Sequence, residues 1–235
     1  IDGPQADAAA ILRATMPRTP DERIVIIDID EKSLERVGHW PWGRDKLAAL
    51  THELFERQQA AVVGFDVLFA EADGSSGLSS LQRLADGPLR GQRGFREQIA
   101  QLAPSLDYDA LFASALRGRP AVLGYYFTSD RDGRTKGTLP APALPVERLR
   151  GLPLRATSWN GYGSNIEQLA RAVPVAGFFN SITDDDGVVR SLPLLAEYRG
   201  KYYESLALAM FRALLELPEI HPDYVSPNPM GAHDT

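Results

Sequence analysis

The sequence predicts an α/β domain: a mixed sheet with βαβ units and a C-terminal antiparallel hairpin, with helices packed on the sheet. Two apolar runs rich in β-branched residues, 24–29 and 61–65, flank a segment with helical periodicity. A strand, a helix and a second strand within about 40 residues form a βαβ unit with parallel strands. Near the end of the chain, residues 188–203 have the pattern of a hairpin.

The composition excludes several classes of protein. The formal net charge of −6 argues against a general nucleic-acid binder, because phosphate contacts need a positive face. The absence of cysteine excludes a thiolate–metal site and fits an extracytoplasmic compartment. No apolar run approaches the about 18–20 residues that a membrane span needs, so we expect a soluble piece of a longer protein. We expect no nucleic-acid partner and no cofactor.

The first part of the chain predicts a linker and then a strand. Residues 1–23 are rich in alanine and then in proline and arginine, which is typical of a linker that contains a short helix. The unbroken apolarity of 24–29 predicts a strand with both faces buried. Asp30 is expected to cap a short helix over 31–37, and Gly38 to end it.

The next helix is predicted over 45–59. Leu47, Leu50 and Leu54 fall on one helical face, so we expect this face to be buried against the sheet. The apolar run 61–65 then predicts a second buried strand.

The middle of the chain alternates between long polar segments and apolar ones. Residues 74–106 are predicted as an inserted, arginine-containing excursion with two short helices, near 78–85 and 95–103. Asp107 and Asp109 can each cap the helix that follows. A third strand is predicted over 121–127, and a long loop over 128–165.

The last block completes a single domain over 24–217. Strands are predicted over 175–180 and 188–198, and a tight turn at 199–200 leads to a return strand over 201–203. The helix after Ser205 is apolar nearly all round, which predicts burial. Residues 218–235 are predicted as a tail.

Two aspartate patterns suggest chemistry, and each has a structural alternative. Asp28 and Asp30 form a D-x-D motif after the first strand, as in phosphatases with an aspartyl nucleophile, but a buried Asp28 and a helix-capping Asp30 explain the motif better. Asp184 to Gly187 lacks the later oxygen ligands of an EF-hand, so a turn with Gly187 at positive φ is favoured over a calcium site. No metal site and no catalytic residue are expected.

The order of several motifs resembles the second class of CHASE domain. The resemblance depends on H-W-P-W-G-R within 24–50, G-F-D within 60–73, D-Y-D-A-L within 107–116, and N-S-I-T-D-D-D-G-V-V-R within 175–210. It implies a non-catalytic, extracytoplasmic (periplasmic) sensor in a membrane-anchored bacterial receptor. In such receptors a helix enters the sensor from the N-terminal side, and several membrane spans follow it. The implied cytoplasmic output is an adenylate or guanylate cyclase, a histidine kinase, a Ser/Thr kinase or a diguanylate cyclase. The implied partners are an unidentified small ligand or periplasmic protein and a second copy of the chain. A dimerisation module without a small ligand is the alternative.

The resemblance also implies a missing strand. Members of this family continue beyond the helix after Ser205 with a further strand, so we expect one position in the sheet to be vacant. We expect 24–29 or 61–65 to lie at that edge, covered by a second chain in a homodimer, by the tail beyond Pro218, or by the excursion over 74–106.

The candidate site residues are landmark residues of the strands and motifs described above, and most of them are expected to be structural. Arg44 and Arg190 are expected to pair with acidic residues, and the two tryptophans to be partly buried. A ligand pocket is expected at the strand ends and the loop 128–165, with walls from Tyr125, Tyr126, Trp159 and Tyr162. The full set is Asp28, Trp40, Trp42, Arg44, Asp66, Asn180, Asp186 and Arg190.

Overall fold

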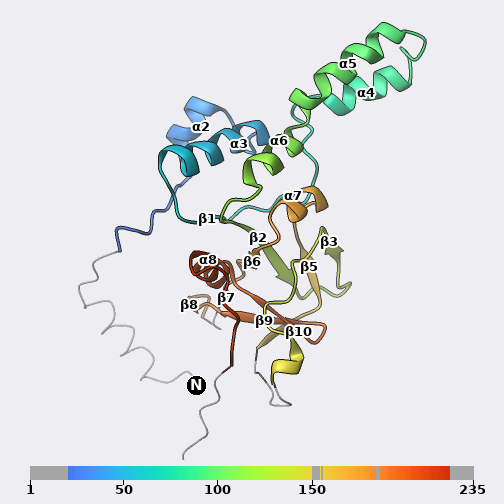
Figure 1. Cartoon of the computed structure of the whole chain (residues 1–235). Helices are drawn as coiled ribbons and strands as arrows, with labels where there is room; N and C mark the ends of the chain where they lie inside the picture. The colour runs from blue at the N-terminus through green and yellow to red at the C-terminus, as the bar shows by residue number, and fades with distance from the viewer. Residues whose placement is uncertain (1–20, 150–153, 155, 184–185, 223–235) are drawn as a thin grey trace, which may run out of the picture. The chain divides into compact units, whose positions relative to one another are not determined.

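The computed structural model describes residues 21–149, 154, 156–183 and 186–222 (Figure 1). It divides into two compact units, one up to Trp42 and one from Gly43 onward. The boundary between them falls inside the predicted single domain 24–217.

The first unit contains helix α2 (Glu31–Val37). Its cap is the predicted one, because Asp30 accepts a hydrogen bond from the Ser33 N–H at 2.9 Å. The helix ends at Gly38, whose φ of +107° suits glycine. The prediction of a buried strand over 24–29 is wrong for the single chain: Ile24 to Ile27 belong to no strand and are 55–88% exposed. Apolarity favours burial of such a segment but does not specify what buries it.

The second unit is built on a sheet with a parallel centre. Strand β2 (Ala121–Thr128) pairs in parallel with β1 (Val63–Phe65) and with β6 (Ala176–Phe178). The registers align Val63 with Ala121 and Leu123 with Ala176. The predicted strands at 61–65, 121–127 and 175–180 are thereby confirmed, and so is the parallel pairing of the first two.

The segment predicted as a loop over 128–165 contains several short strands. The second half of β2 pairs antiparallel with β5 (Gly161–Gly163), which pairs in parallel with β3 (Thr135–Lys136). In the sequence, a 3₁₀ helix, η2 (Val146–Leu149), and strand β4 (Thr157–Trp159) lie between β3 and β5. These strands are two or three residues long, which is too short for an alternating pattern to reveal.

A second sheet contains the predicted hairpin. Strands β9 (Leu195–Tyr198) and β10 (Lys201–Glu204) are antiparallel, and β4 pairs with β9. Their turn has positive φ at both Arg199 and Gly200, as expected for a two-residue hairpin. The strand predicted over 188–198 is interrupted after β8 (Val189–Ser191), which pairs with β7 (Ile182–Thr183) instead. Pro193 lies in the interruption and lacks the N–H that a ladder needs.

Helices cover the first sheet. The predicted helix over 45–59 consists of α3 (Arg44–His52) and a π-helical turn, η1 (Glu53–Arg57), and it packs on α6 (Tyr108–Leu116). Leu47 and Leu54 are buried and Leu50 is half-buried. These positions agree with the predicted helical face, but α3 packs mainly on α6 and not on the sheet as was predicted.

Four further helices complete the described part of the second unit. The two helices predicted inside the excursion are confirmed as α4 (Leu78–Asp86) and α5 (Arg93–Leu106), which pack on each other (Figure 1). Helix α7 (Glu167–Ala172) packs on α6, and α8 (Leu206–Leu214) packs on β2 and β6. The expectation that α8 is buried all round is wrong, because Phe211 and Leu214 are more than half exposed.

Candidate functional site: buried ion pairs around the sheet

Arg44 occupies the first turn of α3, at a place where the backbone is tightly enclosed. The preceding residue, Gly43, has no room for a side chain: an added Cβ would lie 2.5 Å from the Asp45 carboxylate and 2.7 Å from the Ser75 hydroxyl. Glycine therefore brings the start of α3 against the loop that follows β1 and directs Arg44 into the protein, where it is 7% exposed.

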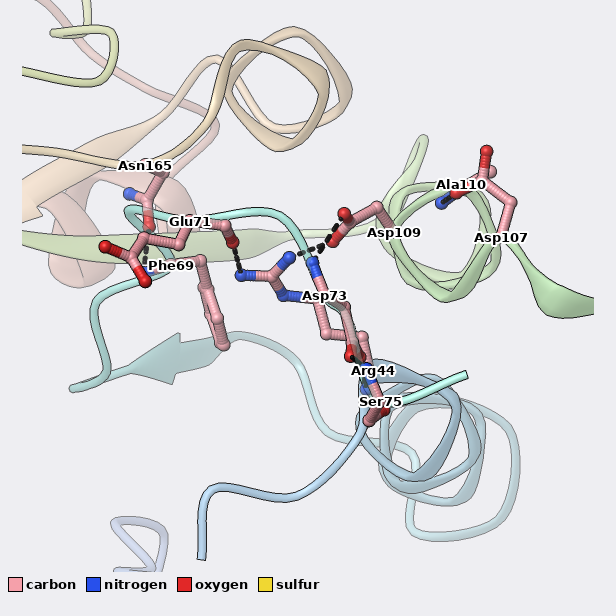
Figure 2. Close-up of polar contacts among 9 residues, drawn as sticks. All are labelled: Arg44, Phe69, Glu71, Asp73, Ser75, Asp107, Asp109, Ala110 and Asn165. Carbon is pink, nitrogen blue, oxygen red and sulfur yellow. Dashed lines mark hydrogen bonds and ion pairs between the residues drawn. The ribbon is translucent and has the colours of Figure 1, made fainter. Parts of the chain in front are cut away.

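The Arg44 side chain joins three elements (Figure 2). Its guanidinium forms an ion pair with the buried Asp109 of α6, and it donates a hydrogen bond to the Glu71 carbonyl. The Arg44 N–H donates to the Asp73 carboxylate at 2.6 Å. The Asp73 N–H donates in turn to the second Asp109 oxygen at 2.9 Å. The network therefore fixes α3, α6 and the loop after β1 to one another.

The same loop is held from its other side by an asparagine. The Asn165 side chain accepts a hydrogen bond from the Phe69 N–H and donates one to the Gly124 carbonyl of β2, both at 3.0 Å. The Phe69 ring lies under the Arg44 guanidinium, 5.3 Å from ring centroid to Cζ. Asn165 is 2% exposed, so its polar groups are stabilised by these bonds rather than by solvent.

Both carboxylates of this network accept hydrogen bonds from it. Burial raises the pKa of Asp73, but the N–H donors of Arg44 and Ser75 and the positive charge of Arg44 outweigh it, so the pKa is lowered. Both Asp109 oxygens accept hydrogen bonds and Arg44 is paired. An arrangement of this kind stabilises the fold and leaves no acid, base or nucleophile free for chemistry.

A second buried ion pair joins the end of β10 to the last turn of α8. Glu204, the last residue of β10, pairs with Arg212 at 2.6 Å, and both side chains are less than 15% exposed. Burial raises the pKa of the Glu204 carboxyl, while the hydrogen bond and charge of Arg212 oppose the rise. Arg212 also donates to the Pro218 carbonyl at 2.9 Å, so the pair fixes the chain that leaves α8.

Tyrosines surround this pair. Burial raises the pKa of Tyr125 well above its usual value, and the neighbouring Tyr203 and Glu204 contribute to the rise. The hydroxyls of Tyr125 and Tyr198 are buried and make no hydrogen bond to the described residues. Tyr203 and Tyr198 both pack on Phe127 of β2, with ring centroids 5.6 and 5.8 Å away. The two sheets therefore meet in an aromatic core that surrounds the Glu204 carboxylate.

Asn180 extends the sheet with its side chain. It accepts a hydrogen bond from the Phe127 N–H at 2.7 Å and donates one to the Phe127 carbonyl at 2.9 Å. The amide thus takes the place that the next residue of a strand would have beside β2. These two bonds attach the chain after β6 to β2.

Replacing Asn180 by alanine is expected to lower the free energy of unfolding by about 1–3 kcal/mol, because the N–H and C=O of Phe127 lose their partners. Urea unfolding followed by circular dichroism measures the change. Asn180→Asp keeps an acceptor but loses the donor, so an intermediate loss is expected. A loss below that of an exposed control such as Asn160→Ala would contradict the role given to Asn180.

The other described candidate residues make none of the hydrogen bonds of the Arg44 network. Asp28 and Asp66 are exposed. Asp186 accepts a hydrogen bond from the Val188 N–H at 3.1 Å in a turn where Gly187 has φ +83°, as predicted. The Arg190 side chain lies outside the described part of the structure, so its expected pairing stays a prediction. Arg44 has the acidic partner that was predicted for it.

The two tryptophans of the first unit contact each other. The Trp40 and Trp42 rings are 5.9 Å apart at an interplanar angle of 66°, and the Trp42 indole N–H donates to the Gly38 carbonyl at 2.7 Å. The peptide bond between Trp40 and Pro41 is cis. Trp42 is half-buried, whereas Trp40 is 40% exposed.

A small pocket lies beside α7. It has a volume of about 180 Å³ and is lined by Leu123 and Ala176 of the sheet, by 138–141, and by residues of α7. This volume lies below the about 300–1,000 Å³ of typical small-molecule sites. Residues 138–141 belong to the segment 128–165, and the described lining residues include no aromatic side chain. Tyr125, Tyr126, Trp159 and Tyr162 lie elsewhere.

The phosphatase alternative loses its structural premise. Asp28 and Asp30 follow no strand, and Asp30 caps α2. Within the described residues, no group of three or more His, Cys, Asp or Glu residues is placed to hold a metal ion. In the same part of the chain, no helix combines the length and apolarity of a membrane span.

Sequence reasoning missed the acidic partners in both buried pairs. Asp109 was considered only as a helix cap, but Asp107 alone caps α6, by accepting from the Ala110 N–H at 2.9 Å. Two acids two residues apart, of which one caps a helix, leave the other available for a partner. Glu204 and Arg212 carry a similar signal: they are the only charged residues over 202–215, an otherwise largely apolar stretch.

The described part of the chain combines a mixed α/β fold with two buried ion pairs. A family model, the CHASE2 domain, matches residues 5–233, nearly the whole chain. The chain therefore belongs to the CHASE2 family, whose members are extracellular sensor domains, and the resemblance noted in the sequence is confirmed. Searches of curated proteins and of solved structures found no match.

Proposed function

We propose that this chain is the extracytoplasmic sensing part of a bacterial membrane receptor and passes a signal to a cytoplasmic cyclase or kinase. The observation that carries the proposal is the family match over residues 5–233. The two buried ion pairs join separate elements of the fold, which supports a structural role for these charges. The ligand is a small molecule or a periplasmic protein.

A thermal-shift screen of the chain against metabolites and ions tests the sensing role. A ligand that binds only the native state at 100 times its Kd adds about 2.7 kcal/mol of stability, which raises the melting temperature. The same ligand is then added to membranes that contain the complete receptor, and cyclic-nucleotide synthesis or phosphotransfer is measured. A shift accompanied by a changed output supports the proposal.

Two results would contradict it. Hydrolysis of an aryl phosphate in the presence of Mg²⁺, abolished by Asp28→Asn, would restore the phosphatase alternative. A screen without any shift, together with an output that depends only on association of the chain, would favour a dimerisation module.

A further inference from the structure

The pocket beside α7 lies on one face of the first sheet. Its floor is formed by Leu123 of β2 and Ala176 of β6, which lie opposite each other in the parallel register. Both floor residues are buried. One wall of the pocket is α7 and the other is the segment 138–141. The cavity is therefore enclosed by the sheet, by a helix and by a segment of the long connection after β2.

Hydrogen bonds hold the wall 138–141 in place. At its start, the Thr138 N–H donates to the Asn165 carbonyl at 2.9 Å. Just beyond the pocket, the Ala143 N–H donates to the Tyr202 carbonyl of β10, also at 2.9 Å. A ligand therefore meets a wall that is already ordered, which reduces the entropy lost on binding.

Alanines keep the cavity open. Ala141 lines it from the wall, Ala170 from α7 and Ala176 from β6. A longer apolar side chain at any of these positions would occupy part of a volume of only about 180 Å³. An engineered apolar cavity of about 150 Å³ holds benzene, so this pocket has room for a ligand body about as large as a six-membered ring.

The lining is apolar inside and charged at the rim. Leu123, Val173 and Ala176 are buried, whereas Glu167 and Arg171 of α7 are exposed. These two are the only charged residues among the described lining residues. A ligand that fits this lining has an apolar body and a polar end near the rim.

Arg171 is the better of the two rim charges for anchoring that polar end. It pairs with Glu167 at 2.5 Å, but the two side chains are 78% and 66% exposed, so exchanging this partner for another costs little. A guanidinium can form two parallel hydrogen bonds to a carboxylate, whereas Glu167 would contact an ammonium as a point charge. A carboxylate is therefore favoured over an amine as the polar end.

We propose that the pocket beside α7 binds a small carboxylate with an apolar body. The body lies between Ala170 and the floor of the pocket, and the carboxylate pairs with Arg171. This inference gives the sensing role proposed above a ligand class and in that respect rests on it, whereas binding itself can be measured on this chain alone.

Benzoate, benzamide and benzamidine test the proposal, because they share a phenyl ring and differ in the charge of the end group. Each compound is titrated into the chain and binding is followed by NMR chemical shifts. We expect benzoate to bind with a Kd on the order of 1 mM, in keeping with its small size. Benzamide and benzamidine should bind more weakly by about fivefold or more, since neither can form the charged pair with Arg171. No binding of benzoate, or binding of the other two that is as tight, would overturn the proposal.

Variants of α7 separate the parts of the site. Ala170→Leu fills the cavity and is expected to weaken benzoate binding by about tenfold or more. Gln168→Leu, at an exposed position of the same helix that does not line the pocket, is the matched control and should bind benzoate as the natural chain does. Equal binding of benzoate by these two variants would overturn the proposal.

Arg171→Gln tests the anchor without disturbing the core, because the Arg171 side chain is 78% exposed. The variant should bind benzoate only as tightly as benzamide, and its affinity for benzamide should equal that of the natural chain. An unchanged preference for benzoate would mean that Arg171 is not the anchor and would overturn the proposal.

The pocket assignment and the sensing role can fail separately. If benzoate does not bind but another compound of the thermal-shift screen changes the output of the complete receptor, the pocket assignment is wrong and the sensing role stands. If benzoate binds as described and no compound changes the output, the pocket assignment stands and the sensing role is wrong.

Discussion

Replacing Asp109 by alanine is expected to lower the free energy of unfolding by about 3–5 kcal/mol, because the buried Arg44 guanidinium then loses the carboxylate with which it forms its ion pair. Asp109 and Arg44 are each 7% exposed, and water cannot replace the lost carboxylate without opening the protein. The substitution also removes the acceptor for the Asp73 N–H, so the loop after β1 loses one of its attachments to α6. Urea unfolding at pH 7 measures the change.

Asp107 provides the matched control for this experiment. It lies two residues before Asp109 but caps α6 from outside, so Asp107→Ala is expected to cost about 1 kcal/mol. The double variant Arg44→Met, Asp109→Leu should recover much of the loss, since apolar residues of similar size often replace buried ion pairs without cost. If Asp109→Ala costs no more than Asp107→Ala, the network does not stabilise the fold as described.

The elements that were predictable from the sequence are those whose signal is local. The cap at Asp30, the turn at Gly187 and the tight turn at Arg199 and Gly200 follow from the conformational preferences of single residues. Strands β1 and β2 follow from short apolar runs. The run over 24–29 is also mainly apolar, like the runs that form β1 and β2, but it forms no strand in the single chain. An apolar composition does not specify which strand a segment pairs with.

The site was less predictable because its partners are distant in sequence. Arg44 and Asp109 are 65 residues apart, and Asn165 joins Phe69 across 96 residues. The residue types indicated that Arg44 needs a carboxylate, but not which one. The strands between residues 128 and 165 depend on long-range contacts in the same way: Gly163 is required because an added Cβ would lie 2.5 Å from the Tyr126 ring.

The second buried pair is expected to make stability depend on pH in a direction opposite to that of most carboxylates. Burial raises the pKa of Glu204 in the folded state, so the folded protein holds this proton more tightly than the unfolded chain. The stability that this group contributes is complete below its unfolded pKa and is lost as the pH rises through the folded value. Carboxylates such as Asp73, whose pKa is lowered, contribute stability that is lost as the pH falls.

Removing Arg212 is expected to enlarge the pH dependence of stability that Glu204 causes. Arg212→Met leaves Glu204 without its 2.6 Å partner, which raises the pKa of the carboxyl further. At pH 7 the unpaired charge should cost about 3–5 kcal/mol. Near pH 4.5, where Glu204 takes up a proton, the loss should be clearly smaller. Urea unfolding of the variant and of the natural chain is measured at both pH values. The difference between the two proteins isolates the contribution of Glu204, because carboxylates elsewhere titrate alike in both.

Glu204→Gln is the control that separates charge from packing. It keeps the shape of the side chain and cannot ionise, so Glu204→Gln, Arg212→Met should show the same loss relative to Glu204→Gln at pH 7 and at pH 4.5. A loss for Arg212→Met alone that does not change with pH would mean that Arg212 acts through its stem and its bond to the Pro218 carbonyl, and that the carboxylate of Glu204 contributes little.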